Sequence, residues 1–260
     1  MKNKIIFFGN GPLADYALAV LERHFEVIFH ARTKEDLEEV KRLKRENPEA
    51  HGILASFGVM IRSDVLDLFE PEGILNIHPS LLPLYRGASP IESAILNGDT
   101  EFSVSVMKLV KAMDAGPVYY QKTLSGLPMN KFEIYQALAE TGAEWLVKNL
   151  PNLPEPAPQD NSLATFCGKF DKSMSLLSPE TDTAEQTFRK IVAFQGYPKP
   201  KFAFYGIYCI VLEAHILKPG ETAVLSIPCA DGGFVVIDRL QPEGRKAMDA
   251  KSFLNGYAKN

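Results

Sequence analysis

The chain has 260 residues, of which 46% are hydrophobic, and a net charge of −4. It is longer than a typical domain of ~100–150 residues, so we expect two domains, each with its own core. The acidic balance is not that of a strong nucleic-acid binder. No apolar run approaches the ~18–20 residues of a membrane span or the ~7–15 residues of a signal-peptide core, so we expect a soluble cytoplasmic protein.

The first 78 residues alternate short apolar segments with amphipathic ones. We expect strands at 4–8, 25–30, 52–57 and 74–78, and helices at 13–23, 34–45 and 63–69. This alternation predicts an α/β fold with a parallel sheet and helices on its faces. A Gly-rich turn after the first strand has Ala14 where a GxGxxG motif requires its third Gly, so it is weak evidence for a dinucleotide site.

The segment at 74–78 carries two polar side chains. Asn76 and His78 lie two residues apart, so in a strand they point to the same face. Pro79 restricts His78 to an extended conformation, which places the pair at the carboxyl edge of the sheet, where ligands bind. A second apolar run, at 102–110, leads to Asp114, and Gly116 favours a turn that brings Asp114 beside His78. An amide donor, a proton-handling group and an orienting carboxylate suit acyl transfer.

Four prolines make residues 151–162 a stiff segment, which we interpret as a linker. We therefore expect a catalytic domain at 1–150, ending in a helix at 132–150, and a second domain at 163–260. In the second domain, a helix at 183–194 and short strands at 201–205, 207–215, 222–228 and 233–239 predict a small β-barrel. The three cysteines lack metal-ligand spacing, so we expect buried thiols and no metal.

Three segments carry a family resemblance. They are NIHPSLLP at 76–83, RGASPI at 86–91 and MDAGPV at 113–118. In this order they resemble the folate-dependent formyltransferases, and most of all the methionyl-tRNA formyltransferases. Residues 240–256 resemble the OB-like C-terminal domain of the same family. The resemblance implies a Rossmann-like formyltransferase domain followed by a small OB-like β-barrel domain, and a cis bond before Pro83.

The resemblance also implies roles for individual residues. The formyl group of 10-formyltetrahydrofolate passes directly to an amine, without a metal or a covalent intermediate. Asn76 and protonated His78 hydrogen-bond the tetrahedral oxyanion, and Asp114 orients His78. The residues expected to hold the folate are Ser56, Phe57, Gly58, Val59, Met60, Ile61, Lys111 and Met113. Those expected near the amine substrate are Gly9, Asn10, Gly11, Pro12, Ser80, Leu81, Leu82, Pro83, Arg86 and Gly87.

Two of these residues have simpler interpretations. Phe57 follows a buried strand, so it could belong to the core instead of the folate site. Arg86 could be a solvated surface charge instead of a group that positions its loop or the amine substrate.

The acceptor is the open question. The family's tRNA enzymes carry an extra βα unit with a basic loop, whereas here only one helix fits between the second strand and the strand at 52–57. We expect charged initiator tRNA to be the acceptor, bound through the C-terminal domain by a monomer. The alternatives are formylation of a nucleotide-linked amino sugar or another small amine, or a non-catalytic relative that binds folate or RNA.

Overall fold

The computed structural model describes residues 2–258, apart from the side chain of Pro151. The chain divides into two compact units. The N-terminal unit contains the residues up to Ile91 and Thr100–Gly168, and the C-terminal unit contains Glu92–Asp99 and the residues from Lys169 onward. Part of α4 (Pro90–Asn97) thus groups with the C-terminal unit, and residues 151–168 group with the N-terminal one.

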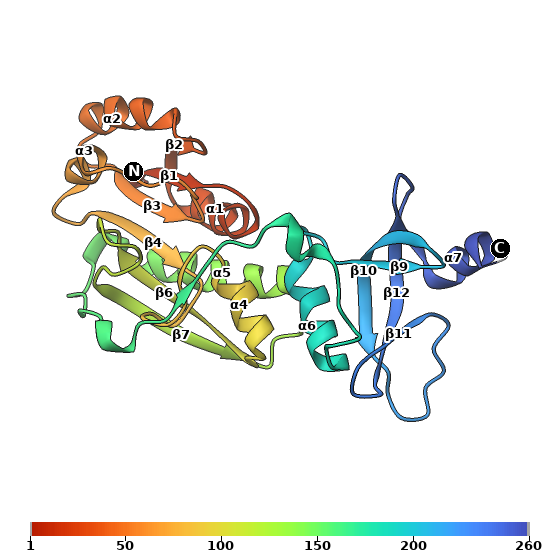
Figure 1. Cartoon of the computed structure of the whole chain (residues 1–260). Helices are drawn as coiled ribbons and strands as arrows, with labels where there is room; N and C mark the ends of the chain where they lie inside the picture. Colours follow the sequence, from red (N-terminus) through yellow and green to blue (C-terminus); the bar gives the residue numbers. More distant parts are fainter. Residues whose placement is uncertain (1, 259–260) are drawn as a thin grey trace. The chain divides into compact units, whose positions relative to one another are not determined.

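The N-terminal unit is built on a six-stranded sheet in the order β2-β1-β3-β4-β6-β7 (Figure 1). Neighbouring strands from β2 to β4 are parallel, as predicted, whereas β6 and β7 run antiparallel to their neighbours. The strands are β1 (Lys4–Gly9), β2 (Glu26–Ala31), β3 (His51–Ala55), β4 (Ile74–His78), β6 (Glu101–Lys108) and β7 (Val118–Ser125). The connection between β6 and β7 spans only residues 109–117, which is too short for the crossover that a parallel pair needs.

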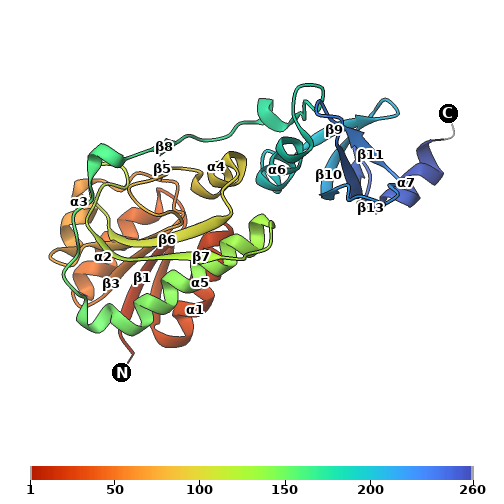
Figure 2. The same cartoon turned by 90° about the horizontal axis from the view of Figure 1, so that it is seen from below.

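Helices cover both faces of this sheet. They are α1 (Pro12–His24), α2 (Asp36–Glu46), α3 (Ser63–Leu66) and α5 (Lys131–Asn149). Helices α1 and α5 pack side by side (Figure 2). On the other face, Ile6, Phe8 and Ile74 share a core with side chains of α2 and α3. Because side chains alternate along a strand, Asn76 and His78 lie on the same face of β4 as Ile74.

Short elements complete the N-terminal unit. A two-residue strand β5 (Arg86–Gly87) pairs with β8 (Phe166–Cys167), and 3₁₀ turns lie at Asp67–Phe69, Leu150–Asn152 and Asn161–Leu163. Trp145 of α5 stacks on Tyr120 of β7, so it packs on the sheet.

The C-terminal unit contains an antiparallel sheet in the order β11-β12-β10-β9, and β13 pairs with β12. Its strands are β9 (Lys201–Phe204), β10 (Ile207–Ile216), β11 (Ser226–Pro228), β12 (Phe234–Pro242) and β13 (Met248–Asp249). A 3₁₀ turn (Lys172–Ser175) and two helices, α6 (Ala184–Phe194) and α7 (Ala250–Tyr257), complete it. The sequence predicted a small β-barrel here, and the structure has a small domain with one antiparallel sheet, on a core that includes Ile191, Val211 and Phe253.

Local chemistry explains how these elements begin. Thr183 caps α6 in a reciprocal capping box with Gln186. Asp249 caps α7, a helix that the sequence analysis missed, by accepting from the N–H of Ser252. Two of the three thiols are buried as expected, and burial raises the pKa of Cys209 to about 11. Cys167 is only half-buried, because it lies on the two-residue strand β8.

Candidate active site

Strand β4 places Asn76 and His78 side by side at its carboxyl end, between β3 and β6. Both residues are buried, at 5% and 4% exposure. The side-chain amide of Asn76 makes no hydrogen bond to any residue between 2 and 258, and it is not sealed from solvent. A buried amide with a free N–H can donate to an oxygen that enters the site.

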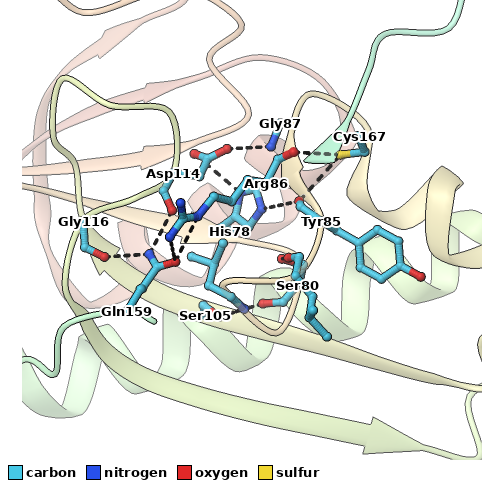
Figure 3. A network of polar contacts seen from close by, with 12 residues as sticks. His78, Ser80, Tyr85, Arg86, Gly87, Ser105, Asp114, Gly116, Gln159 and Cys167 are labelled. Atoms are coloured by element: carbon cyan, nitrogen blue, oxygen red, sulfur yellow. Dashed lines mark hydrogen bonds and ion pairs between the residues drawn. The ribbon is translucent and has the colours of Figure 1, made fainter. Parts of the chain in front are cut away.

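The ring of His78 lies between two oxygen atoms (Figure 3). Its Nε2 is 3.1 Å from the carbonyl oxygen of Tyr85, and its Nδ1 is 3.8 Å from Oδ1 of Asp114. The Tyr85 carbonyl is an acceptor within hydrogen-bond distance of the ring, whereas 3.8 Å is longer than a hydrogen bond. The structure thus brings the predicted partner Asp114 to ion-pair distance from His78.

The loop after β6 holds Asp114 in an uncommon backbone conformation. Its φ is 48°, in the left-handed region that few residues other than Gly adopt. Its Oδ2 accepts the backbone N–H of Gly87 at 2.8 Å. A Cβ on Gly116 would lie 1.8 Å from the carbonyl oxygen of Lys108, so only Gly fits in this loop. The Asp-x-Gly spacing noted in the sequence is therefore required by the close approach of two chain segments.

A buried hydroxyl organises the loop after β4. Ser105 of β6 is fully buried, and its Oγ donates to the carbonyl of Ser80 at 2.6 Å. The same Oγ accepts the N–H of Leu82 at 3.1 Å and the side-chain N–H of Gln121 at 3.0 Å. The bond between Leu82 and Pro83 is cis, as expected. Leu82 is buried in the core, and Leu81 is 40% exposed. The two neighbours, both expected near the amine substrate, therefore cannot contact it in the same way.

Arg86 is not a solvated charge. It is only 4% exposed, and its guanidinium donates to the side-chain oxygens of Gln159 and Asn161. The backbone of the next residue, Gly87, has φ 123°, and a Cβ there would lie 2.1 Å from the carbonyl oxygen of Cys167. The chain at 86–87 is thus fixed on one side by β8 and on the other by Asp114.

The residues expected to hold the folate fall into two groups. Phe57 and Ile61 are buried, Phe57 packs edge-on against Phe8 at 5.7 Å, and Val59 packs on the same core. Met60 and Met113 are 79% and 61% exposed, and Ser56, Gly58 and Lys111 are exposed too. The core interpretation of Phe57 is therefore confirmed, while Met60 and Met113 leave apolar side chains open to solvent on the loops after β3 and β6.

The turn after β1 lies beside the loop after β3. The N–H of Asn10 donates to the carbonyl of Ser56 at 3.0 Å, so the expected amine and folate segments are adjacent here. Gly9 is tightly packed, since a Cβ would meet the carbonyl of Ala55 at 2.5 Å. Gly11 precedes α1 with φ 83° and has open space around it, and Pro12 opens the helix.

Several residues of this network were missed from the sequence. Gln159 and Asn161 come from the Pro-rich segment interpreted as a linker, and Thr165, which was assigned to the second domain, accepts the N–H of Tyr85 at 2.8 Å. Their contacts with residues 85 and 86 join positions more than 70 residues apart, and no local pattern signals them.

None of the helices in the described part of the chain combines the length and apolar character needed to cross a membrane.

Comparisons with known proteins agree with this geometry. The formyl transferase family matches residues 12–150, and the formyl transferase C-terminal domain matches residues 169–258. A methionyl-tRNA formyltransferase of Dictyoglomus thermophilum is 34% identical over 248 residues, covering 88% of this chain and 78% of that protein.

Two solved structures share the fold. The methionyl-tRNA formyltransferase from Clostridium thermocellum has a TM-score of 0.69 at 19% identity, covering 93% of this chain and 99% of that one. HypX from Aquifex aeolicus, in complex with tetrahydrofolic acid, has a TM-score of 0.73 at 18% identity and covers 99% of this chain. The chain spans about half of HypX, 48% of its length. The matched domains and the identity to curated relatives show that this chain belongs to the formyl transferase family.

Proposed function

We propose that the protein transfers the formyl group of 10-formyltetrahydrofolate to the amino group of methionyl initiator tRNA. The observation that carries this proposal is the meeting of Asn76, His78 and Asp114 at the carboxyl end of β4 in a chain of this family. The relatives named methionyl-tRNA formyltransferase support the acceptor. Because charged tRNA is used in the cytoplasm, the proposed function places the protein there.

The chemistry requires stabilisation of one developing charge. The neutral amine attacks the formyl carbon, and the carbonyl oxygen becomes an oxyanion. The Asn76 amide and the protonated His78 ring donate to this oxygen, and Asp114 keeps the ring oriented. The attack forms the new C–N bond, and the tetrahedral intermediate then collapses as the bond between the formyl carbon and N10 of the folate breaks. The amine loses a proton and N10 gains one. Preorganised donors of this kind contribute about 10²–10³ each in rate.

The two exposed methionines support a site for the folate ring. Met60 and Met113 are apolar and open to solvent, and each belongs to a segment that the family resemblance assigns to the donor. Flexible thioether side chains pack well on flat aromatic rings. In this proposal the pterin lies between residues 59–61 and 111–114. The buried Phe57 and Ile61 support that loop from beneath.

The acceptor is expected to approach over two segments, the turn at 9–12 and the loop at 80–87. The proposal keeps a catalytic domain at 1–150, a linker at 151–162 and a C-terminal domain at 163–260. The C-terminal domain is proposed to bind the tRNA. Exposed cations are available there. Lys169, Lys172, Lys199, Arg245 and Lys246 are all exposed. Arg189 and Lys190, by contrast, form ion pairs with Glu185 and Asp182, so they are less suited to phosphates.

The test is a choice between acceptors. The full chain is incubated with 10-formyltetrahydrofolate and either charged initiator tRNA or a nucleotide-linked amino sugar, and formylated product is quantified. We expect turnover with the tRNA, at a rate that falls as salt increases. Turnover with the amino sugar alone would show that the amino sugar, and not tRNA, is the acceptor. Folate binding without product from either acceptor would indicate a non-catalytic relative.

A further inference from the structure

Gln159 uses the whole hydrogen-bonding capacity of its side chain inside the site (Figure 3). Its Nε2 donates to the backbone carbonyl of Asp114 at 2.8 Å and to that of Gly116 at 2.7 Å. Its Oε1 accepts from Nε of Arg86 at 3.1 Å and from Nη2 at 2.6 Å. A primary amide has two N–H donors and one oxygen with two lone pairs, so each of them has a partner.

The two donor contacts fix the loop that presents Asp114. One accepting carbonyl belongs to Asp114 itself, whose φ of 48° is uncommon for a residue with a Cβ. The other belongs to Gly116, where the loop presses against the carbonyl of Lys108. The carboxylate of Asp114 reaches His78 and the N–H of Gly87 only while this backbone is held.

The two accepted bonds act on the opposite side of the site. Arg86 precedes Gly87, the backbone donor to Asp114, and its buried guanidinium is gripped by Gln159. Gln159 therefore joins both segments that meet at the Asp114 carboxylate, the loop that carries it and the strand that donates to it.

We infer that Gln159 is a positioning residue for formyl transfer, which sets the Asp114 carboxylate against His78 without touching the substrates. This inference rests on the proposed function. It assigns to the segment at 151–162 a part in the site, in addition to its passage toward the C-terminal unit.

The sharpest variant is Gln159→Glu. A carboxylate can still pair with Arg86, so the buried cation keeps its partner. It has no N–H to donate, and it places a negative charge beside the carbonyls of Asp114 and Gly116. The matched control is Asn161→Ala, which removes the other acceptor of Arg86 and leaves both loop carbonyls untouched.

Kinetic and hydrogen-exchange measurements on the full chain decide the inference. In Gln159→Glu we expect kcat to fall about 10- to 100-fold while the KM for the acceptor changes less than about threefold. We also expect faster hydrogen exchange of the backbone amides at 114–118 and a changed pH profile of kcat. Asn161→Ala should leave the amide exchange at 114–118 near wild type, because Asn161 does not contact the loop carbonyls, and the thermal midpoint of each variant checks that it is folded.

The outcomes separate this inference from the proposed function. Unchanged amide exchange in Gln159→Glu overturns the positioning role whether or not the protein has activity. Faster exchange with unchanged kcat also overturns it, because the loop would then be held without consequence for the reaction. A wild-type protein that formylates neither acceptor overturns the proposed function and leaves the exchange result to report on the loop alone.

Discussion

The backbone N–H of Gly87 donates to Oδ2 of Asp114 at 2.8 Å, while Oδ1 of the same carboxylate faces Nδ1 of His78 at 3.8 Å. One carboxylate thus connects the strand end that bears the ring with the loop that follows it. A carboxylate that accepts a backbone N–H is held in one orientation. The position of His78 therefore depends on the backbone at residue 87 as well as on its own strand.

This dependence predicts a large effect of a small substitution at Gly87. In Gly87→Ala the added Cβ would lie 2.1 Å from the carbonyl of Cys167, at φ 123°. The strand at 86–87 must shift, and its bond to Asp114 is lost or lengthened. We expect kcat to fall about 10²-fold, the scale of a 1 Å displacement in an active site. The control is Gly126→Ala, where φ is 72° and no atom lies within 4 Å. A kcat equal in the two variants would contradict the account.

The hydroxyl of Ser105 predicts a paired effect on stability and on the loop after β4. Ser105→Ala leaves the N–H of Leu82 and the carbonyl of Ser80 without this partner. Unsatisfied buried groups cost about 1–3 kcal/mol. Urea unfolding should show that loss, and the KM for the amine should rise. Ser103→Ala, two residues away on β6, removes only a bond to Thr123 and should cost less. Equal losses from the two variants would contradict this.

A surface histidine predicts how stability changes with pH. Hydrogen bonds to Asp238 and then to Glu221 hold the pKa of His215 above its usual value. A raised pKa gives stability that is fully present below the unfolded value, about 6.5, and is lost as pH rises through the folded value. Exposed pairs contribute about 0.2–1 kcal/mol. Between pH 6 and 8.5 the urea midpoint of wild type should fall more than that of His215→Gln. If the urea midpoints of wild type and His215→Gln change in parallel with pH, His215 is not the cause of the pH dependence.

The exposed cations of the C-terminal unit predict the salt dependence of tRNA binding. Each lysine that neutralises a phosphate should add about 0.7–0.9 to the slope of log K against log salt. Lys199→Ala and Lys246→Ala should each weaken binding and reduce the slope by about that amount. Lys190→Ala is the matched control, because its ammonium is already paired with Asp182. A slope unchanged in both test variants would place the RNA contacts elsewhere.

Local patterns predicted much of the framework. The strand Ile74–His78 was predicted to the residue, because an apolar run ends at Pro79 and its polar pair has a two-residue spacing. The cap of α6 at Thr183 follows equally from local hydrogen bonding. The predicted start of α2, at residue 34, was wrong by two residues. The helix was expected from residue 34, but the carboxylate of Asp36 accepts the N–H groups of Arg32 and Thr33, and the helix begins at Asp36.

Features that depend on distant contacts could not be predicted in this way. Strand β7 was missed because half of its residues are exposed, none is fully buried, and its segment lacks an apolar alternation. The strand expected at 201–205 is β9, which begins at Lys201, but no local pattern signals that Lys199 precedes it with φ 76°. Gln159 stands among prolines, which indicate a linker, and its partners lie 43 to 73 residues away in the chain.

The most direct test of the account is a single-turnover measurement of formyl transfer with Asn76→Ala and His78→Ala. Each variant is saturated with 10-formyltetrahydrofolate and mixed with charged initiator methionyl-tRNA. We predict a rate about 10²–10³ lower than wild type for each, because each removes a donor to the oxyanion. Affinity for the tRNA should stay unchanged. Near-wild-type turnover in either variant would contradict the assignment of that residue to the reaction.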